Sequence, residues 1–186
     1  MHKNIKLLLL ASILIHSGAN LLAPIYALFI EEIGGTLLDA SIALGIYAMF
    51  KGVFYFGMAK VKESIFPKRA MMFVGYSIMG VGYAGYLIAG KPLDVFIIQG
   101  IVSLGETIIN PSWSAVIASS LEKGKERSIY SNFYGYRSFF EGIAAIVGGL
   151  FAVKFGFNVL FGIMTLFAFS SGALALFVDE KSLTTD

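Results

Sequence analysis

The chain has 186 residues, of which 57% are hydrophobic and only 14% are charged. Soluble domains are roughly 45–50% apolar and about 25% charged, so this composition excludes an ordinary soluble domain and indicates a membrane protein with several spans. The net charge of +2 carries no sign of nucleic-acid binding, and the absence of cysteine excludes disulfides and thiolate metal sites.

The N-terminal stretch MHKNIKLLLL has a basic start and an apolar run, as a secretory signal peptide does. No small-residue cleavage site follows it, and the apolar run continues past Pro24 to Ile30. We therefore expect this stretch to be retained as the first membrane span.

Charges, glycines and prolines divide the rest of the chain into apolar stretches near or above the ~20 residues that cross a bilayer. The expected spans are residues 7–30, 38–59, 70–89, 93–121, 129–153 and 158–178. The fourth is long and contains Pro111, so we expect a kink or an overhanging end there. The sequence thus predicts an all-α membrane protein, a six-helix bundle that forms one domain over residues 1–186.

Six spans bring both termini to one side, and lysine and arginine are concentrated on that side. Ten basic residues belong to it: Lys3, Lys6, Lys60, Lys62, Lys68, Arg69, Lys123, Lys125, Arg127 and Lys181. Only Lys91 and Lys154 belong to the opposite side. The positive-inside rule predicts that both termini are cytoplasmic and that every copy inserts in the same direction.

Polar residues recur at helical spacing along spans one, two, four and five, so each of these spans has one polar face. The candidate pathway residues are, in chain order, His16, Asn20, Tyr47, Lys51, Tyr55, Glu106, Asn110, Tyr134, Arg137 and Glu141. Spans three and six have no charged residue in their interior. We expect the four polar-faced helices to line an aqueous space and the other two to support them from outside.

Five of these residues are ionisable and lie at similar depth, near or just inside the bilayer midplane at about 1.5 Å of rise per residue. Lys51 and Arg137 balance Glu106 and Glu141, and such a neutral cluster is how membranes tolerate buried charge. Simpler interpretations stay open. His16 can be a structural hydrogen-bonding residue, and Arg137 and Glu141 can form a plain intrahelical pair.

Two stretches resemble the major facilitator superfamily. LLAPIYALFIEEIGGTLLDASIALGIYAMFKGVF is similar to the family's first two helices, and LEKGKERSIYSNFYGYRSFFEGIAAIVGGLFAVKFGFNVLF to its fourth-to-fifth loop, fifth helix and start of the sixth. The whole chain resembles one six-helix half of such a transporter. In that family helices one, two, four and five face the cavity or the interface between halves.

The loop after the second helix departs from the family pattern G-x-x-x-D-R-x-G-R-R/K. Here it reads GMAKVKESIFPKR, which keeps Gly57, Lys68 and Arg69 but has no aspartate at the acidic position. The resemblance therefore assigns Gly57, Lys68 and Arg69 to a gating loop from which the aspartate is missing.

The resemblance implies a transporter of small molecules. A single six-helix half would expose its polar face to lipid unless a second helix bundle packs against it. We expect two copies to form a parallel homodimer that works by alternating access. If transport is proton-coupled, Glu106, Glu141 or His16 carries the proton. The cavity would suit a polar, zwitterionic or amphipathic molecule.

Three other hypotheses compete with a homodimeric transporter. The chain can be the N-terminal half of a longer transporter, or a non-transporting scaffold or assembly partner. An enzyme is disfavoured, because the sequence has no H-E-x-x-H, no G-x-S-x-G and no pair of interior aspartates. We expect no cofactor, no metal and no nucleic-acid partner, and a multi-pass location in a prokaryotic plasma membrane.

Overall fold

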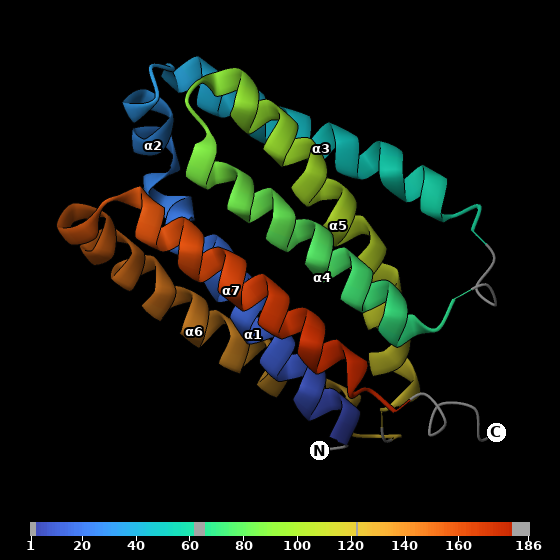
Figure 1. Cartoon of the computed structure of the whole chain (residues 1–186). Helices are drawn as coiled ribbons and strands as arrows, with labels where there is room; N and C mark the ends of the chain where they lie inside the picture. The colour runs from blue at the N-terminus through green and yellow to red at the C-terminus, as the bar shows by residue number, and fades with distance from the viewer. Residues whose placement is uncertain (1–2, 62–65, 122, 180–186) are drawn as a thin grey trace.

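The computed structural model describes residues 3–61, 66–121 and 123–179, and within them every long element is a helix (Figure 1). The elements are α1 (Lys3–Leu22), the 3-10 turn η1 (Ala23–Ile25), α2 (Tyr26–Glu32), α3 (Leu37–Met58), α4 (Lys68–Gly85), the 3-10 turn η2 (Tyr86–Ile88), α5 (Pro92–Ser119), α6 (Glu126–Phe155) and α7 (Phe157–Leu176). The segments α1, η1 and α2 together form one continuous helical span, and so do α4 and η2. Counted in this way, the described chain has six helical spans that are long and apolar enough to cross a membrane. The predicted all-α class with six such helices is confirmed.

Local sequence signals account for where these helices bend, begin and end. Pro24 lies in η1, where its missing N–H donor breaks the α-helical hydrogen bonding of the first span. Thr36 and Asp39 form a capping box that begins α3, with the Asp39 Oδ2 accepting from the Thr36 N–H at 2.8 Å. Gly156 ends α6 with a φ of +77°, a conformation that favours glycine. Pro111 does not end α5, which continues for eight residues beyond it to Ser119.

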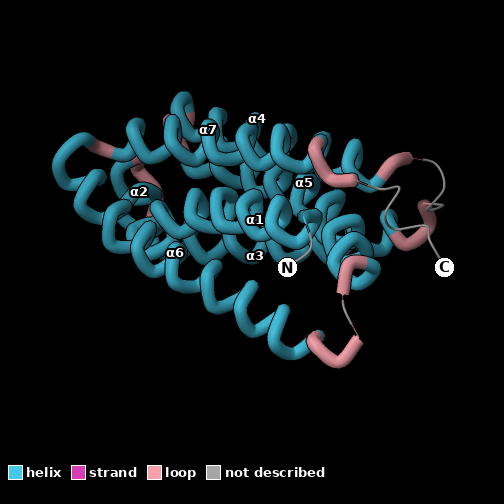
Figure 2. Tube along the Cα trace, turned by 90° about the horizontal axis from the view of Figure 1, so that it is seen from below, coloured by secondary structure: helices cyan, strands magenta, loops and turns pink. Residues whose placement is uncertain are grey.

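The six helical spans follow one another in an open arc rather than in chain order. Neighbours along the arc are α3, α5, α4, α7, α1 and α6. Figure 2 shows α4 and α7 along one side of the molecule and α3 and α6 along the opposite side. The two end helices are correspondingly the least covered, since only 11% of the apolar window of each is buried, against 39–44% for the other four. The arc therefore leaves an open side between α3 and α6.

Glycines allow the closest helix approaches. A Cβ placed on Gly75 of α4 would lie 2.7 Å from the Gly105 carbonyl oxygen of α5, and one on Gly105 would lie 2.6 Å from the Gly75 carbonyl oxygen. A Cβ on Gly148 of α6 would lie 2.0 Å from the Leu21 carbonyl oxygen at the end of α1. Small residues at such positions let membrane helices pack backbone to backbone. Gly149, in contrast, faces open space.

The two ends of the described chain lie together at one end of the bundle (Figure 1). The Asn4 side chain binds the Asp179 backbone in both directions, donating to the carbonyl oxygen at 2.8 Å and accepting from the N–H at 3.0 Å. The end of α3 and the start of α4 lie at the same end of the bundle, as do the end of α5 and the start of α6.

Candidate functional site

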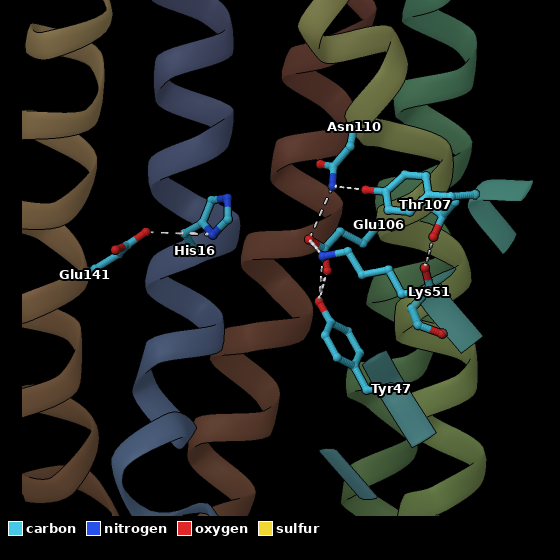
Figure 3. Close-up of polar contacts among 9 residues, drawn as sticks. His16, Tyr47, Lys51, Glu106, Thr107, Asn110 and Glu141 are labelled. Atoms are coloured by element: carbon cyan, nitrogen blue, oxygen red, sulfur yellow. Dashed lines mark hydrogen bonds and ion pairs between the residues drawn. The ribbon is translucent and has the colours of Figure 1, made fainter. Parts of the chain in front are cut away.

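One polar cluster joins α3 to α5. The Lys51 Nζ lies 2.6 Å from the Glu106 Oε1. The Tyr47 hydroxyl donates to the other carboxylate oxygen, and the Lys51 Nζ lies 3.4 Å from that hydroxyl (Figure 3). Lys51 has no acid within four residues on its own helix, and α5 supplies its partner from 55 residues away.

Asn110 extends this cluster by one helical turn. Its Nδ2 donates to the Tyr55 hydroxyl at 2.6 Å and approaches the Glu106 Oε1 at 3.4 Å. The Glu106 carboxylate therefore accepts from three side chains on two helices. Three of the predicted pathway residues contact it, Tyr47, Lys51 and Asn110, and a fourth, Tyr55, joins the cluster through Asn110.

A second polar cluster joins α1 to α6. The Arg137 Nε lies 3.0 Å from the Glu141 Oε1, and the His16 Nδ1 lies 3.7 Å from the same oxygen. The Arg137 guanidinium also lies 5.1 Å from the ring centre of Tyr134, a cation–π contact. Asn20 is outside this group, since its side chain donates to the His16 carbonyl oxygen of its own helix at 2.9 Å.

Two donors near this cluster have no hydrogen-bond acceptor in the described part of the chain. The Arg137 Nε is buried and, despite its short distance to Glu141, is not aligned for a hydrogen bond with it. The Ser12 Oγ is also buried without a partner, and Ser12 as a whole is 2% exposed. Buried polar groups normally make a hydrogen bond, so these two donors could each bind an acceptor from outside the described chain.

A cavity of about 400 Å³ lies between the two clusters. Five of the predicted pathway residues line it: His16, Tyr47, Glu106, Asn110 and Arg137. Figure 3 shows His16 and Glu141 on one side and the Lys51–Glu106 cluster on the other. A volume of this size lies near the lower end of the roughly 300–1,000 Å³ typical of small-molecule pockets.

The cavity also has walls that the polar stripes did not predict. Span three was expected to lie outside, but in α4 and η2 three tyrosines are buried and line the cavity: Tyr76, Tyr83 and Tyr86. Gln99 of α5 donates to the Tyr26 hydroxyl at 2.8 Å, and both line it as well. Gln99 lies seven residues before Glu106, on the same helix face, so extending that stripe backwards would have found it.

The three residues assigned to the gating loop lie at the end of the bundle where the described chain begins and ends. Gly57 is in the last turn of α3 with open space around it, and Lys68 and Arg69 begin α4. Residues 62–65 of the loop between them lie outside the described residues.

Several known proteins resemble this chain. The family model described as Major Facilitator Superfamily matches residues 8–185. The uncharacterized MFS-type transporter YitZ of Bacillus subtilis (strain 168) is 21% identical over 159 residues, which cover 86% of this chain and 96% of YitZ. The uncharacterized MFS-type transporter MJ1560 of Methanocaldococcus jannaschii is 24% identical over 166 residues, 87% of this chain and 42% of MJ1560.

A solved structure shares the fold. The crystal structure of the peptide transporter POT in complex with sulfate superposes with a TM-score of 0.79 over 98% of this chain, at 18% sequence identity. The matched part is 39% of the POT chain. At this identity the likeness is one of fold alone.

Proposed function

Because this chain belongs to the major facilitator superfamily, we propose that it moves a small molecule across the membrane by alternating access, as a parallel homodimer that encloses one cavity. Membrane transport itself is supported by the family match and by the transporter fold. The homodimer, the access mechanism and the coupling are the further steps of the proposal.

The exposure of the charged clusters carries the proposal. In the single chain the ionisable side chains of both clusters are 19–39% exposed, midway along helices that are otherwise apolar. Ionisable groups at membrane depth normally face a bundle interior or water rather than lipid. A second bundle laid across the open side of the arc would remove these groups from lipid and turn the space between them into a closed cavity.

A second copy of the chain can supply the bundle that shields the charged clusters from lipid. Transporter folds with two similar halves place the substrate site between them. YitZ is a relative matched over nearly its whole length, so a relative of about this size exists in the family. MJ1560 and POT are longer, and in chains of that length a second half can supply the same surface. That arrangement is the competing form of the proposal.

The orientation of the homodimer follows from charge. Most loop lysines and arginines are at the end of the bundle that holds the start of α1 and the end of α7. The positive-inside rule supports a cytoplasmic location for this end in a prokaryotic plasma membrane. Two copies inserted the same way have their two-fold axis along the membrane normal, which makes the dimer parallel.

Alternating access can be tested without knowing the substrate, because the chain contains no cysteine. Ala19 lines the cavity, so a membrane-impermeant maleimide should label Ala19→Cys in right-side-out vesicles and also in inside-out vesicles. Ala168→Cys is the matched control. Ala168 of α7 is fully buried in the bundle, at 0% exposed, so its cysteine should react from neither side. Labelling of Ala19→Cys from one side only would contradict alternating access and favour a scaffold that does not transport.

A further inference from the structure

We propose that Ser12 and Arg137 form a subsite for the carboxylate of an amphipathic substrate. This inference rests on the proposed transport function and narrows its substrate class. Both side chains line the cavity, and each has a buried donor atom that makes no hydrogen bond within the part of the chain that the structure describes.

Ser12 and Arg137 lie within about one helical turn of each other along the bundle. His16 contacts Glu141 between α1 and α6, and Gly148 packs on Leu21 farther along both helices, so α1 and α6 run parallel. Ser12 precedes His16 by four residues, and Arg137 precedes Glu141 by four residues. A step of four residues is about one helical turn, so Ser12 lies one turn before the His16–Glu141 contact. Arg137 begins one turn before that contact as well, and its side chain reaches toward it, with the Nε 3.0 Å from the Glu141 Oε1.

The Arg137 guanidinium has further N–H donors besides the one that faces Glu141. The ion pair with Glu141 runs through the Arg137 Nε, and a guanidinium has five N–H donors in all. Arg137 lines the cavity, whereas Glu141 is not part of its wall. A carboxylate is the ligand group that matches a guanidinium and a hydroxyl donor together.

The opposite wall disfavours an ammonium group as the main anchor. Glu106 is the acid in the cavity wall, and it already accepts from Tyr47, Lys51 and Asn110. A cationic ligand would have to displace Lys51 at 2.6 Å from Glu106. A carboxylate would meet the Ser12 hydroxyl, which has no acceptor in the described chain, and the Arg137 guanidinium, both in the cavity wall.

The remaining wall is suited to an apolar or aromatic body. Six apolar side chains from four helices form much of it: Ile15, Met79, Val102, Ile109, Trp113 and Met164. With a cavity of about 400 Å³, this wall fits a small aryl- or alkyl-carboxylate rather than a highly hydrated sugar.

The chain has a built-in reporter for the test, because Trp113 is its single tryptophan and lines the cavity. The full chain in lipid nanodiscs would be titrated with 4-phenylbutyrate, its neutral isostere 4-phenylbutanamide and the cation 4-phenylbutylamine, with Trp113 fluorescence as the readout. We expect the carboxylate to bind about tenfold tighter than the amide or the amine, since only it can accept charge-assisted hydrogen bonds from Arg137 and Ser12.

Substitutions in the protein give the second arm of the test. Ser12→Ala and Arg137→Gln should each weaken 4-phenylbutyrate binding about tenfold, while amide binding changes little. Ser77→Ala is the control, because the Ser77 hydroxyl donates to the Phe73 carbonyl oxygen of its own helix and does not line the cavity. If Arg137→Gln does not fold, Ser12→Ala and the three ligands on the unchanged chain still decide.

Equal affinity for carboxylate and amide, tightest binding of the amine, or an unchanged affinity in Ser12→Ala would overturn the subsite. The ligand-binding test of the subsite and the labelling test of transport can fail independently. If Ala19→Cys is labelled from both sides but the carboxylate does not bind selectively, only the subsite fails. If the carboxylate binds selectively but Ala19→Cys is labelled from one side, the subsite stands and the transport proposal fails.

Discussion

At the scale of single residues, Glu106 is the centre of the polar contacts between α3 and α5. Its carboxylate neutralises Lys51, whose side chain is only 26% exposed, and it accepts from Tyr47 and Asn110 as well. Removing one member of a partly buried ion pair leaves the other charge without compensation, and this costs more than the pair itself contributes.

A double-mutant cycle on this pair should therefore show strong coupling. Glu106→Gln keeps the shape but leaves Lys51 uncompensated, and we expect it to lower the free energy of unfolding by about 2–4 kcal/mol. Lys51→Met/Glu106→Gln should recover about 1–3 kcal/mol of that loss, because the double variant buries no unpaired charge. Thermal unfolding in detergent measures both. The exposed Glu31→Gln serves as the control, and purely additive effects of the two substitutions would contradict the coupling.

The acids are also the candidate proton carriers, together with His16. If transport is proton-coupled, Glu106→Gln or Glu141→Gln should abolish uptake driven by an imposed pH gradient in proteoliposomes. Exchange of internal for external substrate at equal pH should survive, since exchange needs no net proton movement. A substrate identified by a ligand-stabilisation screen would be the probe. Gradient-driven uptake that persists in both variants would rule out coupling through either acid.

At the scale of helices, glycine determines how closely α6 packs on α1. A methyl group on Gly148 would meet the Leu21 carbonyl oxygen at 2.0 Å, and a backbone atom cannot rotate away as a side chain can. Gly148→Ala should therefore lower the free energy of unfolding by about 1–3 kcal/mol and loosen the contact between Glu141 and His16. Gly149→Ala, one residue later in open space, should be neutral or slightly stabilising because alanine favours the helix. Equal thermal stability of the two variants would contradict this packing.

The sequence predicted the helices well because apolar length and charged breaks are local properties of the chain. Spacing also grouped Lys51 with Tyr47 and Arg137 with Glu141, since residues four apart share a helix face. Spacing could not choose Glu106 as the partner of Lys51, because that pairing depends on α5 lying beside α3. For the same reason it missed Tyr76 and Tyr83, which are polar only at the hydroxyl and look like packing residues until the neighbouring helices are placed.

At the scale of the whole molecule, the open side of the arc is the reason why the proposal requires a second bundle. Its two ends are α3 and α6, and a two-fold axis along the membrane normal would set α3 of one copy against α6 of the other. The exposed apolar residues of α3 and α6 do not show whether these helices face a second bundle or lipid, because either can cover apolar side chains. The charged clusters do favour a partner, since lipid cannot cover them at low cost.

Disulfide cross-linking can locate that partner on a background that has no cysteine of its own. Met49 lies twelve residues from the start of α3, and Ile143 twelve residues from the end of α6, so at about 1.5 Å per residue both are about 18 Å from the same end of the bundle. Both are exposed in the single chain, at 66% and 43%. Chains carrying Met49→Cys together with Ile143→Cys should therefore form covalent dimers in native membranes under mild oxidation.

The control pair carries cysteines on the other side of the arc, where the proposal places lipid. Val81 of α4 and Leu166 of α7 are exposed to a similar degree, at 58% and 63%, and Val81→Cys with Leu166→Cys should stay monomeric. Co-expression of Met49→Cys and Ile143→Cys on differently tagged chains should give only mixed dimers, because the proposed contact joins α3 to α6 and never like to like. Cross-linking of the control pair alone would place the dimer contact at α4 and α7 and would contradict the proposed contact between α3 and α6. A monomeric mass in nanodiscs, with neither pair cross-linked, would instead favour a covering half supplied by another polypeptide segment.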